Sequence, residues 1–202
     1  MMSLSAPFRK FLSIPTAQQP RRRLVLDEMP AAVYAIGDVH GCYALLQRLE
    51  ETIISDAKTI PGKKLIVYLG DIIDRGEQVS RVFEHVLSDP PPGFERLCLC
   101  GNHEFLMKSF VDDPSKNHQW LEFGGMQTLH SYGLEIPHRF NQREFAMKIS
   151  INIPEAHREF LAGLPVSLEL PEYFLVHAGI DPEKSLSEQT EADMLWIRGR
   201  FL

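Results

Sequence analysis

Three short apolar runs in this sequence end in the same way, with a glycine followed by a side chain that can bind a metal ion. The runs are "AVYAIGD" (32–38), "KLIVYLGD" (64–71) and "ERLCLCGN" (95–102). Helical spacing of apolar residues over 45–53 and 79–87 separates them. This strand–helix order predicts parallel βαβ units with right-handed crossovers. Because ligands bind at the carboxyl ends of such strands, we expect Asp38, Asp71 and Asn102 to lie together.

The rest of the chain predicts an α/β domain with a helical insertion. Helical patterns fill most of residues 105–165, and we expect this stretch to lie beside the sheet edge. The runs "VSLEL" (166–170) and "YFLVH" (173–177) predict a hairpin that returns the chain to the carboxyl ends of the strands. We therefore expect one domain over residues 31–202.

The start of the chain differs from this body in charge. Residues 1–26 carry five basic side chains and no acidic one, whereas the whole chain has a net charge of -6. The acidic body argues against non-specific nucleic-acid binding. The Pro, Ser and Gln content of residues 1–30 favours a disordered arm, with an organelle presequence as the alternative. No apolar run reaches the roughly 18 residues of a membrane span, and three cysteines suit a reducing, cytoplasmic setting.

Four short motifs supply the side chains of a possible metal centre. They are "GDVHG" (37–41), "GDIIDRG" (70–76), "GNHE" (101–104) and "HAG" (177–179). Asp38 and His40 lie two positions apart in an extended turn, so both can hold one ion. Asp71 has two carboxylate oxygens and can bridge two ions, while Asn102 and His177 offer neutral ligands to the second ion.

This combination of ligands predicts a hydrolase with two metal ions. Oxygen and nitrogen ligands without thiolate suit Mn²⁺, with Fe, Zn or Mg as alternatives. Two ions about 3.5–4 Å apart can share a hydroxide and hold a phosphoryl group for in-line attack. Taken singly, the residues have simpler explanations: a helix cap for His40, turn carboxylates for Asp71 and Asp74, and an N-cap for Asn102. Their joint occurrence at one end of one predicted sheet favours the metal site.

His103 follows the expected ligand Asn102, so we expect its side chain to point elsewhere. A histidine beside a metal centre can protonate the leaving oxygen when a carboxylate fixes its tautomer and raises its pKa, and Asp74 is the candidate for that partner. The neighbouring Arg75 offers a fork of donors for phosphate oxygens, although an ordinary surface arginine is the alternative.

With these motifs in this order, the sequence resembles the calcineurin-like metallophosphoesterases. More narrowly, it is similar to the phosphoprotein phosphatase family in its bacterial, phage lambda phosphatase-like branch. The resemblance runs from about Val33 to Leu202, and residues 120–133 resemble the insert of bacterial members. It implies an α/β fold of the metallophosphoesterase type, a layered β-sandwich flanked by helices, and serine/threonine phosphatase activity on a phosphorylated protein or a small phosphoester.

The resemblance also implies a role for each motif residue. Asp38 and His40 would bind the first metal, Asp71 would bridge, and Asn102 and His177 would bind the second. His103 and Asp74 would form an acid pair, and Asn102 and Arg75 would contact the substrate phosphate. The block "LWIR" (195–198) implies a second phosphate-binding arginine, Arg198, for which an ordinary basic residue is the alternative.

One feature of the family is not found in this sequence. The family has a further metal-binding histidine, in a Gly-His context, downstream of the arginine block. The histidines not yet assigned are His85, His118, His130, His138 and His157, and none of them follows a glycine. We therefore expect a domain that lacks its C-terminal part, a second metal with three protein ligands, and weakened catalysis.

The sequence leaves the substrate open between two classes. The Asp-Arg pair of "GDIIDRG" favours phosphomonoesters or phosphoproteins, because the symmetrical dinucleoside tetraphosphate hydrolases depart from the pattern at that aspartate. Other tetraphosphatases keep the pair, so dinucleoside tetraphosphate hydrolysis stays the alternative. A catalytically impaired module that only binds metal and phosphate is the alternative of another class.

Overall fold

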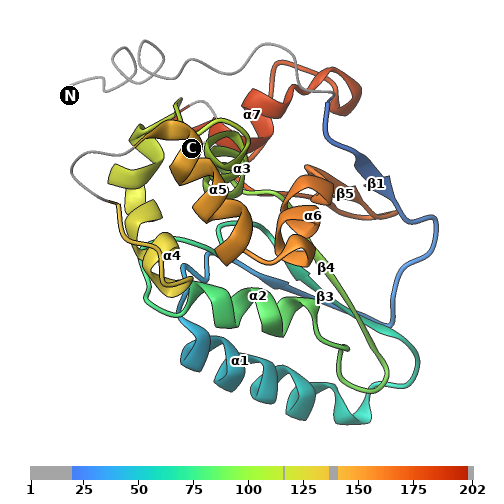
Figure 1. Ribbon diagram of the computed structural model, residues 1–202. Helices are drawn as coiled ribbons and strands as arrows, with labels where there is room; N and C mark the ends of the chain where they lie inside the picture. Colours follow the sequence, from blue (N-terminus) through green and yellow to red (C-terminus); the bar gives the residue numbers. More distant parts are fainter. Residues whose placement is uncertain (1–19, 116, 137–140, 200–202) are drawn as a thin grey trace.

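The computed structural model describes residues 20–115, 117–136 and 141–199 (Figure 1). Its central sheet contains β2 (Ala32–Ile36), β3 (Lys64–Tyr68) and β4 (Phe94–Cys98) in the order β2-β3-β4. All neighbours are parallel, with Ala32 opposite Lys64 and Lys64 opposite Phe94. The predicted parallel βαβ arrangement is therefore confirmed.

A second sheet contains β1 (Arg23–Val25), β5 (Ser167–Glu169) and β6 (Phe174–Val176) in the order β1-β5-β6. Strands β5 and β6 pair antiparallel, which confirms the predicted hairpin. Strand β1 pairs parallel with β5. The expectation of a disordered arm up to residue 30 is therefore wrong for β1, which is part of the folded body, and residues 1–19 lie outside the described residues.

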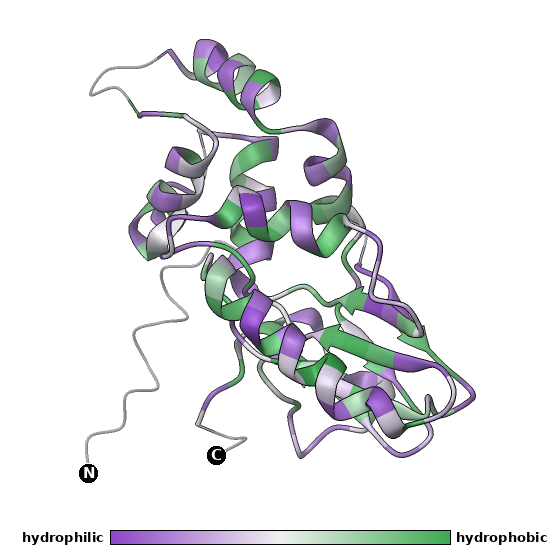
Figure 2. Cartoon of the chain, turned by 90° about the horizontal axis from the view of Figure 1, so that it is seen from below, coloured by the Kyte–Doolittle hydropathy of each residue, from purple (hydrophilic) through white to green (hydrophobic). Residues whose placement is uncertain are grey.

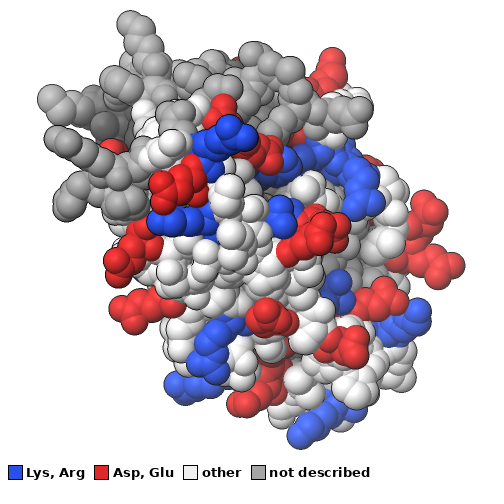
Figure 3. Space-filling view, viewed as in Figure 1, with Lys and Arg blue, Asp and Glu red and all other residues white. Residues whose placement is uncertain are grey.

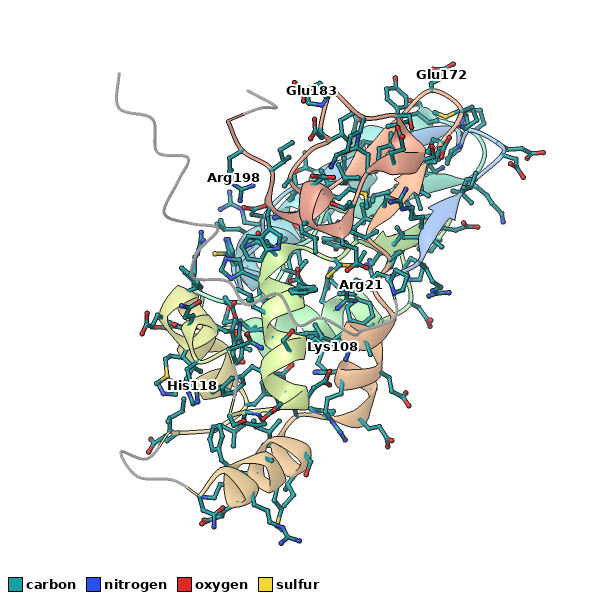
Figure 4. All side chains as sticks on the ribbon, turned by 90° about the horizontal axis from the view of Figure 1, so that it is seen from above. Arg21, Lys108, His118, Glu172, Glu183 and Arg198 are labelled. Carbon is teal, nitrogen blue, oxygen red and sulfur yellow. The ribbon has the colours of Figure 1, made fainter. Side chains whose placement is uncertain are left out.

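Side chains of neighbouring arginines explain why this basic segment is ordered. The Nη1 of Arg21 donates to the backbone carbonyls of Leu161 and Leu164, both at 3.1 Å, and Arg22 Nη2 donates to the carbonyl of Gly163 at 3.1 Å. These carbonyls lie at the C-terminal end of a helix, where they have no intrahelical partner. Figure 4 labels Arg21 beside that helix. The basic side chains thus satisfy polar groups that are distant in sequence.

The two sheets form a sandwich because successive side chains of a strand point to opposite faces of its sheet. Leu65 and Val67 of β3 pack with Leu168 and other leucines of the second sheet in the layer between the sheets. Ile66 and Tyr68, which point the opposite way, join the main core under the helices. The strands are accordingly mostly hydrophobic in Figure 2. This is the layered α/β sandwich that the sequence predicted.

Helices cover the other face of the central sheet and form the insertion. Helices α1 (Tyr43–Asp56) and α2 (Val79–Leu87) lie side by side in Figure 1. The predicted insertion contains α3 (Asn102–Asp112), a π-helical turn η3 (Leu121–Gly125), α4 (Met126–Ser131), α5 (Gln142–Asn152) and α6 (Glu155–Gly163). The short elements η2 (Ala57–Thr59), η4 (Leu186–Glu188) and α7 (Glu191–Trp196) complete the described chain. Helices therefore fill most of the stretch predicted to be helical, although α3 begins earlier, at Asn102, and His138 lies outside the described residues.

The surface gives no sign of segregated charge where it can be seen. On the face shown in Figure 3, acidic and basic side chains are interspersed. Among the described residues, no helix is both long enough and apolar enough to cross a membrane.

A buried ionic cluster joins α1 and α2 to the central sheet. The Glu50 carboxylate is 4% exposed and accepts hydrogen bonds from Tyr68 Oη, from His85 Nε2 at 2.8 Å and from Arg96 Nη2 at 3.0 Å. Burial alone would raise the pKa of Glu50. The hydrogen bonds from His85 and Tyr68 and the charge of Arg96 together lower it by more than burial raises it, so the pKa lies below its usual value of 4.5. The charged form is therefore the one that the fold stabilises.

Glu50→Gln is expected to lower the free energy of unfolding at pH 7 by about 2–4 kcal/mol, because Arg96 loses its buried anionic partner. A depressed folded-state pKa gives stability that is present above pH 4.5 and lost as the pH falls through the folded pKa. Urea unfolding at pH 7 and at pH 3 measures both effects. The exposed neighbour Glu51→Gln is the control, and an equal loss at both pH values would contradict the ionic explanation.

Candidate active site

The loops that follow β2 and β3 are joined by backbone hydrogen bonds at the carboxyl edge of the sheet. The amides of Val39 and His40 donate to the carbonyl of Asp71 at 3.0 and 2.9 Å, and the amide of Gly41 donates to Ile72 at 2.9 Å. Because these loops carry Asp38, His40 and Asp71, their side chains are held in fixed relation. The ends of β2 and β3 therefore lie together, as predicted, and backbone hydrogen bonds hold their loops in place.

The first turn of α3, which follows β4, joins them through a buried carboxylate. Glu104 is fully buried, and its two oxygens accept the amides of Asp71 at 2.7 Å, Ile72 at 2.9 Å and Gly101 at 2.8 Å. Burial, followed by the charge of Asp71, raises the pKa of Glu104 to about 7. Gly101 is required here, because a Cβ would lie 2.1 Å from Asp71 Oδ1.

The backbone is strained at the site. Outside glycine, the described residues with positive φ are His40 (44°), Asp71 (52°), Asp74 (68°), Arg75 (65°) and Asn117 (57°). Each such conformation costs about 1–3 kcal/mol and persists only where its surroundings enforce it. Four of the five belong to the motifs selected from sequence, which is typical of a functional site.

The expected ligands gather around one oxygen of Asp71. Its Oδ2 lies 3.5 Å from His177 Nε2 and 4.0 Å from His40 Nε2. His40 Nε2 also lies 3.8 Å from Asp38 Oδ2, and His177 Nε2 lies 2.8 Å from Asn102 Oδ1. The structure therefore brings together all five residues for which the sequence predicted metal ligation.

The outer nitrogens of both histidines are fixed by backbone carbonyls. His40 Nδ1 lies 2.7 Å from the carbonyl of Ile73, and His177 Nδ1 lies 3.0 Å from that of Leu69. An imidazole that donates from Nδ1 presents a lone pair at Nε2, which is the usual arrangement of a metal-binding histidine. Burial lowers the pKa of both His40 and His177, which favours this neutral form.

Three polar groups of the site lack something that a bound cation would supply. His40 Nε2 is buried without a hydrogen-bond partner among the described residues. His177 faces an oxygen on each side, Leu69 O and Asn102 Oδ1, and a neutral ring has only one proton to donate. Burial raises the pKa of Asp71 to about 6, because its charge has no full compensation. A divalent ion would satisfy all three groups.

His103 and Asp74 form a close pair beside this cluster. His103 Nδ1 lies 2.6 Å from Asp74 Oδ2, as the sequence predicted. Burial lowers the pKa of His103, but the bond to Asp74 and the charge of Asp71 raise it above its usual value. Arg75, an exposed residue, places its Nη2 3.2 Å from His103 Nε2. A phosphate oxygen that approaches Arg75 Nη2 would therefore also lie beside His103 Nε2.

The grouping of ligand atoms differs in one respect from the prediction. Atoms of His40, Asp71 and His103 lie within 4.8 Å of one another, as do atoms of Asp38, Asp71 and His177. His103 Nε2 is 3.8 Å from Asp71 Oδ2, so position alone makes it a possible ligand as well as a possible acid. Asp74 would orient the ring in either role.

Arg198 lies after α7, on the exposed surface (Figure 4). Burial is the main cause of the lowered pKa of His177, and the charge of Arg198 adds to it. Arg198 Nη1 donates to the carbonyl of Ile197 at 2.9 Å. The role of Arg198 as a second phosphate-binding arginine stays a prediction.

Three residues of the site were not selected from the sequence. Glu104 was quoted within "GNHE" without a role, although a glutamate three residues after a helix N-cap is a signal for a carboxylate that accepts backbone amides. Trp120 Nε1 donates to Asp74 Oδ2 at 2.8 Å, and Thr128 Oγ1 donates to Asp74 Oδ1 at 2.5 Å. Both lie in the insertion, and no local pattern indicates that they reach Asp74.

The comparisons with known proteins agree with this geometry. The family model described as calcineurin-like phosphoesterase matches residues 31–200. The chain belongs to the calcineurin-like phosphoesterase family. A solved structure described as "a putative diadenosine tetraphosphatase" shares the fold, with a TM-score of 0.55 and 20% identity over 86% of this chain and 62% of that chain.

Two curated bacterial relatives are named "Bis(5'-nucleosyl)-tetraphosphatase, symmetrical". The one from Methylococcus capsulatus is 31% identical over 151 residues, which is 75% of this chain and 44% of the relative. The one from Dechloromonas aromatica is 25% identical over 162 residues, which is 79% of this chain and 48% of the relative. This calcineurin-like phosphoesterase chain therefore spans less than half the length of these relatives.

Proposed function

We propose that this chain hydrolyses phosphoric esters with two divalent metal ions held by Asp38, His40, Asp71, Asn102 and His177. The observation that carries the proposal is the gathering of these side chains around Asp71 Oδ2, with two histidine Nε2 atoms within 4.0 Å of it. Mn²⁺ suits such an oxygen and nitrogen ligand set. When bound, the ions neutralise charge on the phosphoryl oxygens and make a water molecule more acidic.

The chain's own residues would then orient the substrate and move one proton. Arg75 and Arg198 bind phosphate oxygens by charge-assisted hydrogen bonds. The oxygen of water adds to phosphorus, the bond from phosphorus to the leaving oxygen breaks, and one proton of water passes to solvent. The protonated His103 gives its Nε2 proton to the leaving oxygen, and Asp74 holds the ring in place.

Dinucleoside tetraphosphates are the first candidate substrate. The support comes from the names of the curated relatives, which share up to 31% identity with this chain. This reverses the lean toward phosphoproteins that the sequence motif suggested. Cleavage at the centre of a bis(5'-nucleosyl) tetraphosphate would release two nucleoside diphosphates.

Phosphomonoesters are the second candidate, and the buried pair of His103 and Asp74 favours them. The alkoxide that leaves from phosphoserine is strongly basic and gains much from a proton donor. A nucleoside diphosphate is a weakly basic leaving group and gains less. A contact of 2.6 Å between His103 and Asp74 is therefore of more use for a phosphomonoester.

We expect the chain with added Mn²⁺ to hydrolyse diadenosine tetraphosphate with a higher kcat/KM than a phosphoserine peptide, because its curated relatives are named for the tetraphosphate. Anion-exchange chromatography measures the products, with ADP as the only nucleotide product. EDTA is expected to stop the reaction, and p-nitrophenyl phosphate serves as a substrate that needs no acid. A preference for the phosphopeptide would support the second candidate.

The same experiment separates an enzyme from a binding module. Elemental analysis gives the number of metal ions per chain before each assay. Metal binding without hydrolysis of any of the three substrates would contradict the proposal and favour a module that only binds metal and phosphate. Hydrolysis that persists in EDTA would contradict the proposed metal dependence.

A further inference from the structure

One segment of the insertion, residues 120–128, closes over the loop that carries Asp74. Trp120 Nε1 donates to Asp74 Oδ2 at 2.8 Å, and Thr128 Oγ1 donates to Asp74 Oδ1 at 2.5 Å. The amide of Asp74 donates back to Thr128 Oγ1 at 3.1 Å. All three side chains are fully buried, so water does not compete for these bonds.

The same segment holds the backbone next to Asp74. The amide of Arg75 donates to the carbonyl of Gly124 at 3.2 Å. Gly124 has a φ of +112°, and a Cβ there would lie 2.6 Å from Arg75 N. Since Asp74 and Arg75 both have positive φ, their conformation depends on outside support of this kind.

These contacts fix the plane of the Asp74 carboxylate. Oδ1 is held by Thr128, and Oδ2 accepts from both Trp120 and His103, the latter at 2.6 Å. A carboxylate held on both oxygens cannot rotate away from the ring. His103 Nε2 is thereby directed to the side of Asp71 Oδ2, 3.8 Å away, and toward Arg75 Nη2, 3.2 Å away.

We propose that Trp120 and Thr128 are positioning residues, which act through Asp74 to aim His103 at the leaving oxygen. This inference rests on the proposed function. It gives residues 120–128 a part in the chemistry, since Trp120 and Thr128 lie 46 and 54 positions beyond Asp74 in the chain and set the orientation of the acid through that carboxylate. The expected consequence is that their loss matters most for substrates whose leaving oxygen is strongly basic.

The test compares Thr128→Val with the unchanged chain on p-nitrophenyl phosphate and phenyl phosphate, with added Mn²⁺. Valine keeps the shape of threonine and removes the hydroxyl donor. For phenyl phosphate we expect kcat to fall about tenfold or more, a part of the roughly 10²–10⁴-fold that a general acid contributes. We expect a smaller loss for p-nitrophenyl phosphate, whose leaving group needs no proton, and unchanged KM and metal content.

Three companion variants make the result specific. Thr128→Ser keeps the hydroxyl and is expected to retain the activity on phenyl phosphate, and Trp120→Phe is expected to repeat the effect of Thr128→Val. Thr52→Val is the matched control, because Thr52 is an exposed residue of α1 whose hydroxyl donates to the carbonyl of Arg48. Thr52→Val is expected to leave the activity on both substrates unchanged.

A spectroscopic measurement covers variants with low activity. The Nδ1 proton of His103 in its short bond to Asp74 is expected to give a strongly downfield NMR signal, which shifts upfield in Thr128→Val and returns in Thr128→Ser. Equal losses on both aryl phosphates together with an unmoved signal would overturn the inference. If the unchanged chain binds metal and hydrolyses neither ester, the proposed function fails, and the inference fails with it.

Discussion

Replacing Asp71 with asparagine is expected to lower kcat on p-nitrophenyl phosphate by about 10³-fold or more, equivalent to about 4 kcal/mol of transition-state stabilisation. Asp71 Oδ2 is the atom around which the candidate ligands gather, with His177 Nε2 at 3.5 Å and His40 Nε2 at 4.0 Å. An amide nitrogen in that place cannot bind a cation. Elemental analysis is expected to show fewer metal ions per chain in the variant.

The substitution is conservative in every other respect. Asparagine is the same size, tolerates the positive φ of 52° at this position, and can still accept the amide of His103 through Oδ1, at 3.0 Å in the present structure. Because burial raises the pKa of Asp71 to about 6, its charge disfavours folding of the metal-free chain above that pH, so thermal unfolding in EDTA at pH 7 is expected to show no loss of stability.

Asp56→Asn is the matched control for Asp71→Asn. Asp56 is an exposed carboxylate at the end of α1 that accepts the hydroxyl of Tyr34 at 2.6 Å. Its replacement is expected to leave both metal content and kcat unchanged. If Asp71→Asn kept its metal ions and its activity, the assignment of Asp71 as the bridging ligand would be wrong.

The sequence was sufficient to predict that the loops with the candidate ligands meet, because their positions follow from topology. Parallel strands present their carboxyl ends at one edge, so three runs that end alike place Asp38, Asp71 and Asn102 together. The helical spacing also predicted α1 and α2 at the correct residues. In each case the information is local in the sequence. It consists of the spacing of the apolar residues in a segment and of the polar residue that follows that segment.

The parts that the sequence analysis missed depend on contacts between distant segments. The composition around Arg21 and Arg22 is typical of a disordered arm, but their partners are carbonyls about 140 positions away in α6. Trp120 and Thr128 are of ordinary types for helical segments. Their role arises only when residues 120–128 pack against the loop of Asp74, and no pattern within the insertion specifies that packing.

Replacing His103 with asparagine is expected to lower kcat on phenyl phosphate by about 10²–10⁴-fold, the usual contribution of a general acid. The reason is the buried pair, in which His103 Nδ1 lies 2.6 Å from Asp74 Oδ2 and leaves Nε2 to face the substrate side. KM is expected to change little, because the substitution leaves Arg75 and Arg198, the proposed phosphate-binding residues, in place. Steady-state kinetics with added Mn²⁺ measures both constants.

Metal content decides between the two roles that the position of His103 permits. If His103 is an acid, its replacement leaves both ions bound, and kcat is expected to fall less on p-nitrophenyl phosphate than on phenyl phosphate. As a ligand in the group with His40 and Asp71, its replacement would release an ion and reduce both reactions equally. His130→Asn, an exposed position at the end of α4, is expected to change neither value. A fall in metal content in His103→Asn alone would therefore reassign His103 from acid to ligand.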